Sequence, residues 1–169
     1  GGAEGQRRGV RQRPGAAVIL RVYGTPASKG SGRAILRGGK ALYLSGGSKQ
    51  QQEQQQSWER AMRDAIDTSG ARMRPYLVPV QVSATFLMQR PKAHYKAGVL
   101  KASAPTWCDK GKDLDKMIRA TLDPLQVYGV LRNDSQVVRV VAVKRYVEAG
   151  EATGAIVEVQ AVEQVKVVR

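Results

Sequence analysis

The chain has 169 residues, of which 42% are apolar and 25% charged, a composition typical of one globular domain. Lysine and arginine number 28 against 14 aspartates and glutamates, which gives a net charge of +14. One cysteine, Cys108, and one histidine, His94, exclude a disulfide framework and a two-histidine zinc site. No run reaches the ~18 apolar residues of a membrane span, and the first residues lack the apolar core of a secretory signal. We therefore expect neither a membrane-spanning helix nor a secretory signal.

The positive charge is concentrated at the start of the chain. Residues 1–50 hold ten basic residues and one acidic residue. Such a surface attracts polyanions, of which nucleic acid is the commonest in a reducing compartment. An anionic membrane is the alternative, but no amphipathic basic helix or lipidation motif is evident. Nucleic acid is the favoured partner.

The first fifty residues predict an arm, a strand and a basic hairpin. Residues 1–15 have almost nothing to bury and are expected to form a disordered basic arm, with 16–169 a single domain. Residues 17–23 are typical of a strand, and two short apolar segments that flank Gly38 and Gly39 indicate a hairpin. A hairpin of this kind lies along a DNA backbone or is simply a flexible surface loop. Its phosphate-contacting candidates are Lys29, Arg33, Arg37 and Lys40.

Two helices follow from the apolar spacing and the end signals. One is expected over residues 50–68, with Trp58 and Met62 on its apolar face. The other is expected from about Asp113 to about Asp123, closed by Pro124. The long segment 89–112, which precedes the second helix, is expected to be a loop.

Alternating and valine-rich runs predict the remaining strands. We expect strands at 78–88 and 136–147, and a strand at 155–162 that pairs with the second of these as a hairpin across 148–154. The tail 165–168 extends the same sheet. The fold class is α+β, a mixed β-sheet with two main helices packed on it in the order β-hairpin-α-β-α-β-β. Its edge strands invite pairing into a dimer.

Acidic residues gather where the rest of the chain is basic. Five of the fourteen lie between residues 109 and 134, and four of these form a pattern: Asp113, Asp115, Asp123 and Asp134. The strand that follows the second helix must pack against it, so Asp134 is expected to approach the Asp113 and Asp115 end. Carboxylates without histidine or cysteine favour Mg²⁺ or Mn²⁺, which suits phosphodiester hydrolysis.

A purely structural role explains the same residues. In that interpretation Asp113 caps the helix, Asp115 pairs with Arg119, and Asp134 caps a turn with Asn133. The spacing alone does not decide between the two interpretations.

One run of residues resembles a known family. The resemblance is to the RusA-type Holliday junction resolvases. It is carried by Lys112-Asp113-Leu114-Asp115, by Asp123, by residues 133–138 (NDSQVV) and by Lys144. The intervals match without gaps from Asp113 to Lys144. A weaker likeness covers residues 17–162, including the glycine, proline, lysine and arginine pattern of residues 24–33.

The resemblance implies a homodimeric, Mg²⁺-dependent endonuclease, with Mn²⁺ as a substitute metal. Such an enzyme resolves four-way DNA junctions by symmetric paired nicks during recombination and repair, in the cytoplasm of a bacterial or phage-infected cell. By position the metal ligands are Asp113, Asp115 and Asp134, and Arg119 is a catalytic candidate. The residues expected to support the site are Asp123, Lys116 and Lys144. Lys110 and Lys112 join the expected DNA contacts.

Three positions depart from the family pattern. Lys116 replaces an asparagine, Asn133 replaces an aspartate, and Arg119 replaces a lysine. Arginine keeps the charge but does not act as a proton donor. A non-catalytic junction- or nucleic-acid-binding protein with a degenerate site is therefore an alternative, and so is a flap or fork nuclease. Trp107, beside the carboxylates, is expected either to pack over the helix or to stack on an exposed base.

Overall fold

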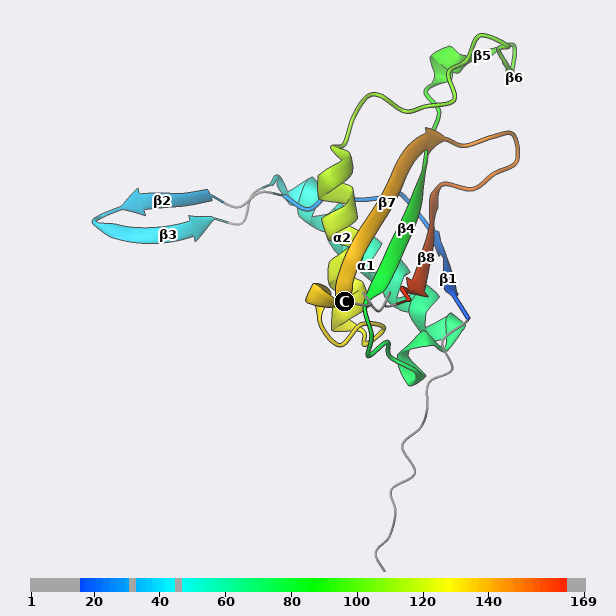
Figure 1. Ribbon diagram of the computed structural model, residues 1–169. Helices are drawn as coiled ribbons and strands as arrows, with labels where there is room; N and C mark the ends of the chain where they lie inside the picture. Colours follow the sequence, from blue (N-terminus) through cyan, green and yellow to red (C-terminus); the bar gives the residue numbers. More distant parts are fainter. Residues whose placement is uncertain (1–15, 31–32, 45–46, 164–169) are drawn as a thin grey trace, which may run out of the picture.

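A mixed four-stranded sheet forms the centre of the protein. The computed structural model describes residues 16–30, 33–44 and 47–163. The strands lie in the order β1 (Val18–Tyr23), β8 (Gly154–Ala161), β4 (Val80–Met88) and β7 (Val137–Tyr146). With two long helices on this sheet, the α+β class is confirmed (Figure 1). The expected arm 1–15 and the tail 165–168 lie outside the described residues.

The strand pairing differs from the expected hairpin. β8 runs antiparallel to both β1 and β4, whereas β7 runs parallel to β4. The prediction that 155–162 pairs with 136–147 was therefore wrong. β4 lies between them, pairing with β8 on one edge and with β7 on the other, and its alternate residues Val80, Val82, Ala84 and Phe86 are buried in the core. The connection 148–154 passes over the end of β4 to reach β8.

Helix α1 (Lys49–Ser69) supplies three of the largest buried side chains of the core. Its start is fixed by a capping box between Ser48 and Gln51, and its end by Gly70 in the left-handed conformation. Trp58, Met62 and Ile66 recur at intervals of four and are buried against the sheet. Both helices lie behind the sheet in Figure 1, so no helix among the described residues covers the opposite face.

Helix α2 (Leu114–Val127) runs past the proline that was expected to end it. Pro124 lies inside the helix, and its carbonyl accepts a hydrogen bond from the backbone N–H of Tyr128 at 2.9 Å. Proline offers no N–H to the carbonyl of Ala120, which normally costs a helix stability. The last turn persists because Thr121, Pro124 and Leu125 are buried in the core.

Two small hairpins project from this body. β2 (Arg33–Arg37) and β3 (Lys40–Leu44) form the predicted hairpin, turning through Gly38 and Gly39, whose φ angles are +58° and +75°. Figure 1 shows it extending away from the sheet. The expected loop 89–112 contains a 3₁₀ turn, η2 (Lys92–His94), and a short hairpin of β5 (Tyr95–Lys96) and β6 (Val99–Leu100). No helix in the described part of the chain is long and apolar enough to cross a membrane.

Candidate active site and nucleic-acid interface

Lys144, near the end of β7, fixes the start of helix α2. Its ammonium donates hydrogen bonds to the carbonyl oxygens of Lys110 at 3.1 Å and Lys112 at 2.8 Å. The backbone N–H of Cys108 donates to the carbonyl of Lys144 at 3.2 Å, and an isolated bridge joins Trp107 to Arg145. These contacts hold the segment before Asp113 against the end of the sheet.

Asp113 presents an ionised carboxylate at this end of α2. It occupies the N-cap position, but its side chain caps no backbone N–H. Instead it accepts a hydrogen bond from the ammonium of Lys116 at 2.7 Å. That hydrogen bond, together with the charges of Lys116 and Lys144, lowers the pKa of Asp113 below its usual value. The expected cap is therefore replaced by an ion pair.

Asp115 and Arg119 stand one helical turn apart on the exposed surface of α2. No hydrogen bond or ion pair within the described residues holds either side chain, so the pairing considered as a structural explanation is not made. A carboxylate and a guanidinium that face solvent beside Asp113 are available to a metal ion and a phosphate. A purely structural role for Asp115 and Arg119 does not explain why both side chains lack a partner within the described part of the chain.

Some of the lysines around the carboxylates donate hydrogen bonds to backbone carbonyl oxygens, and others do not. The ammonium of Lys112 donates to the carbonyl of Pro26 at 2.5 Å, and burial lowers its pKa. Lys144 is likewise engaged with carbonyl oxygens, whereas Lys110 is exposed. Two of these cations thus stabilise the loop, and Lys110 is the one presented to a ligand.

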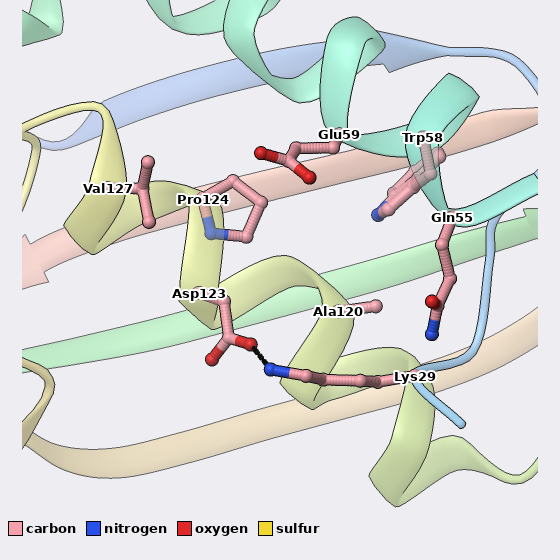
Figure 2. A pocket seen from close by; sticks show the side chains of 8 residues that line it. All are labelled: Lys29, Gln55, Trp58, Glu59, Ala120, Asp123, Pro124 and Val127. Atoms are coloured by element: carbon pink, nitrogen blue, oxygen red, sulfur yellow. Dashed lines mark hydrogen bonds and ion pairs between the residues drawn. The ribbon is translucent and has the colours of Figure 1, made fainter. Parts of the chain in front are cut away.

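Lys29 and Asp123, both expected to serve DNA or metal, form an ion pair with each other. They line a pocket of about 230 Å³ between α1 and α2, together with Gln55, Trp58, Glu59, Ala120, Pro124 and Val127 (Figure 2). The backbone N–H of Lys29 also donates to the carbonyl of Lys116 at 3.0 Å. Lys29 is therefore tied to α2, and Asp123 contacts Lys29 rather than Arg119.

The indole nitrogen of Trp58 in the same pocket was not anticipated. It is buried and has no hydrogen-bond partner among the described residues. The sequence carries no signal for it, because an indole on the apolar face of a helix is usually a core residue. It therefore adds an unpaired donor to the pocket.

Asp134 lies at the opposite end of β7. It begins the 3₁₀ turn η3 (Asp134–Gln136), whose cap is the side chain of Asn133 accepting from the N–H of Ser135. The side chain of Gln136 donates to the carbonyl oxygens of Tyr76 and Val78, in the segment just before β4. Asp134 itself is exposed.

The expected approach of Asp134 to Asp113 does not occur within one chain. Gln136, just before β7, and Lys144 are eight positions apart in the sequence, about 26 Å at ~3.3 Å per residue. The chain descends through α2 and returns along β7, so the start of β7 meets the C-terminal end of the helix. Among residues 16–30, 33–44 and 47–163, no three metal-ligating side chains gather.

Of the remaining DNA-contact candidates, Lys40 is exposed at the turn of the β2–β3 hairpin. Arg33 and Arg37 lie in β2, but their side chains are outside what the structure describes. Trp107 is 61% exposed, so it does not pack over the helix. An exposed indole beside carboxylates and lysines is able to stack on a base.

Together these features define a basic α+β protein that presents ionised carboxylates and a free arginine among lysines, as a phosphodiester-cutting enzyme does. A family model described as endodeoxyribonuclease RusA matches residues 30–160. The chain belongs to this family of endonucleases, which are Holliday junction resolvases and generally depend on a divalent metal. A search of curated proteins found no match.

Proposed function

We propose that this protein resolves four-way DNA junctions by paired symmetric nicks in recombination and repair, as a homodimer that requires Mg²⁺ or Mn²⁺. Family membership supports the substrate class. The observation that carries the proposal to these residues is the exposed pair Asp113 and Asp115 on the first turn of α2, beside Arg119. Asp113 already pairs with Lys116, whereas the carboxylate of Asp115 has no partner among the described residues and is available to a cation.

The donor set suits a hard divalent cation but is incomplete in one chain. Asp113 and Asp115 supply the carboxylate oxygens that Mg²⁺ prefers. Asp134, the third expected ligand, lies at the other end of β7, so a single chain does not assemble the site. Arg119 supplies positive charge toward the phosphate, an electrostatic role that needs no proton transfer.

The DNA-contacting surface consists of the exposed cations around this end of the molecule. Lys40 on the hairpin and Lys110 before α2 meet backbone phosphates, and Arg33 and Arg37 in β2 are kept as further expected contacts from the sequence. Trp107 stacks on a base that is unpaired at the junction centre. Lys112 and Lys144 act indirectly by holding the loop that carries the carboxylates.

A second candidate function is junction binding without cleavage. It is favoured by the departures Arg119 and Asn133 and by the dispersal of the three aspartates in the single chain. It leaves Asp115 without a role, because a carboxylate that has no ion-pair partner among the described residues repels phosphate on a DNA-binding surface.

A cleavage assay separates these functions. A labelled synthetic four-way junction, a fork, a flap and a linear duplex are incubated with the protein, with and without Mg²⁺ or Mn²⁺. We expect metal-dependent paired nicks in the junction that Asp115→Asn abolishes. Asp64→Asn, which alters an exposed carboxylate on α1, is the matched control and retains activity. Tight junction binding with no nicks in either metal would support the binding protein, and preferential cutting of flaps or forks would overturn the junction substrate.

A further inference from the structure

Residues 91–104 form an arm that projects beyond the end of the sheet at which α2 begins (Figure 1). This β5–β6 arm contains η2 and the short hairpin, which turns tightly through Ala97 and Gly98, both with positive φ angles. None of its residues is acidic, and its basic side chains include the exposed Lys92, Lys96 and Lys101. No residue of the arm belongs to the hydrophobic core that the described residues form. The arm is therefore a folded, positively charged projection.

A buried arginine fixes the base of the arm. Arg90 is 7% exposed, and no carboxylate among the described residues pairs with it. Its Nε donates to the carbonyl of Val147 at 2.6 Å, one Nη donates to the carbonyl of Pro105 at 2.8 Å, and the guanidinium lies over the ring of Tyr146. Both ends of the arm are thus tied to each other and to the end of β7. Burial of a cation without an opposite charge is costly, so the position of the arm is maintained against an energetic penalty.

Two cations of the arm are available to a ligand. Lys101 donates to the carbonyl of Ala93 at 2.7 Å, but no hydrogen bond or ion pair within the described residues engages Lys92 or Lys96. The returning segment 105–112 lies against the end of β7 and leads directly into Asp113. The arm is therefore attached beside the candidate carboxylate site. Exposed lysines without acidic neighbours in such a place suit a phosphate backbone.

The β5–β6 arm and the β2–β3 hairpin leave the body in different directions, and in Figure 1 the start of α2 lies between them. Double-stranded DNA is stiff over ~150 base pairs, so a straight duplex that follows one projection does not follow the other. A branched molecule sends duplexes in several directions from one point. Two diverging basic projections beside the carboxylates therefore match a branch better than a linear duplex.

We infer that the β5–β6 arm binds the phosphate backbone of a second duplex of the branched substrate through Lys92 and Lys96, while the β2–β3 hairpin contacts the first. The inference rests on the proposed function for the identity of the substrate and for the hairpin contact, but not on metal binding or cleavage. The arm then favours branched over linear DNA, because only a branch occupies both projections at once.

Binding without metal tests the charges of the arm. Lys92→Gln and Lys96→Gln are combined in one chain, and the matched control combines Arg60→Gln with Arg74→Gln, at exposed positions on α1 and just beyond it. Fluorescence anisotropy in EDTA compares a four-way junction with a linear duplex. At ~0.1 M salt, loss of two phosphate contacts predicts junction binding at least about tenfold weaker, with much smaller changes for the duplex and for the control. An equal loss on both DNAs, or no loss on the junction, would overturn the inference.

Tethered cleavage locates the DNA beside each projection. In a background of Cys108→Ser and Asp115→Asn, an iron–EDTA group is attached to Val99→Cys on the arm or to Leu36→Cys on the hairpin, at positions 69% and 82% exposed. We expect the two probes to cut different duplexes of an immobile junction. Met73→Cys, exposed just past the far end of α1, is the control and should give no localised cuts. Cuts from both probes in the same duplex, or none from the arm, would contradict the inference.

The outcomes separate this inference from the proposed function. If the wild type nicks the junction and the Lys92 and Lys96 variant binds it with full affinity, the inference alone fails, and an acidic protein becomes the better partner for the arm. If the wild type nicks nothing in Mg²⁺ or Mn²⁺ but the variant loses junction affinity and the probes cut different duplexes, the proposed cleavage fails and the inference is supported.

Discussion

Arg145 and Glu151 form the most buried ion pair among the described residues, with side chains 20% and 19% exposed. The guanidinium contacts both carboxylate oxygens, at 2.6 and 2.7 Å. The hydrogen bond from Arg145 lowers the pKa of Glu151 from 4.5 to about 2. Because the folded-state pKa lies below the unfolded one, the stabilisation is complete above about pH 4.5 and is lost as the pH falls toward 2.

Glu151→Gln is therefore expected to lower the free energy of unfolding by about 2 kcal/mol at pH 7, after allowance for partial solvent screening. Urea titrations at pH 7 and pH 3 measure it, and the difference from wild type shrinks at the lower pH. Glu53→Gln, at an exposed position of α1, is the control with little effect. A difference that stayed constant between the two pH values would contradict the role of this ion pair.

Lys116 stands where the family pattern has an asparagine, and it holds the carboxylate of Asp113. Lys116→Asn removes both the hydrogen bond and the charge, so we expect the pKa of Asp113 to rise toward its ordinary value. Carboxyl-carbon NMR over a pH titration measures this directly. Lys49→Asn, at the exposed start of α1, should leave the titration unchanged. An unshifted Asp113 in the Lys116 variant would show that the ion pair does not form in solution.

At the scale of single residues, local position was predictable and distant contact was not. The spacing placed Asp113 and Asp115 together at the start of α2, and both lie exposed there. The partner of Lys29 was missed because Asp123 is 94 positions away and nothing local pairs them. Asp134 was expected near Asp113 because helix and strand were assumed to meet end to end. Their antiparallel course separates those ends.

Gly154 allows β8 to approach the backbone of β1 closely. It lies opposite Tyr23 in the ladder with a φ of +150°, and a Cβ there would lie 1.9 Å from the carbonyl oxygen of Val22. Gly154→Ala is therefore expected to destabilise the protein by more than about 2 kcal/mol, because backbone must move in two strands.

Gly150→Ala is the matched control for this substitution. Its φ of +77° is also unfavourable for alanine, but no atom lies within 4 Å of the new methyl, so a cost of about 1 kcal/mol is expected. Denaturant midpoints of the two variants compare them. Equal losses would mean that strain in the backbone, and not contact with Val22, sets the requirement for glycine.

At the scale of elements, periodicity predicted the two helices and the four sheet strands, because burial imposes it. It did not predict which strands are neighbours. The alternation in 155–162 is satisfied by pairing with any strand that shares its buried face, and in the structure β4 separates β8 from β7. Pro124 was predicted to end the helix because the backbone hydrogen bond that proline loses is evident from the sequence. The burial of Leu125, which compensates for that loss, depends on the tertiary fold.

The net charge of the whole molecule determines how strongly its affinity for DNA depends on salt. With a net charge of +14, binding of a junction in EDTA should weaken steeply with salt, since each phosphate neutralised releases counterions. The slope of log K against log salt changes by about 0.9 for each phosphate that the protein no longer neutralises. Lys40→Gln, at the exposed turn of the hairpin, is thus expected to flatten the slope by about one.

The control for this measurement is Arg74→Gln, which removes an exposed charge beyond the far end of α1, about 31 Å along the helix from its start near the hairpin. Fluorescence anisotropy at salt concentrations from about 50 to about 300 mM, a range chosen to keep binding measurable, gives both slopes. An unchanged slope for Lys40→Gln would place the hairpin away from DNA. An equal change in both variants would mean that overall charge, rather than a defined hairpin contact, governs binding, because only a phosphate contact ties one counterion release to one side chain.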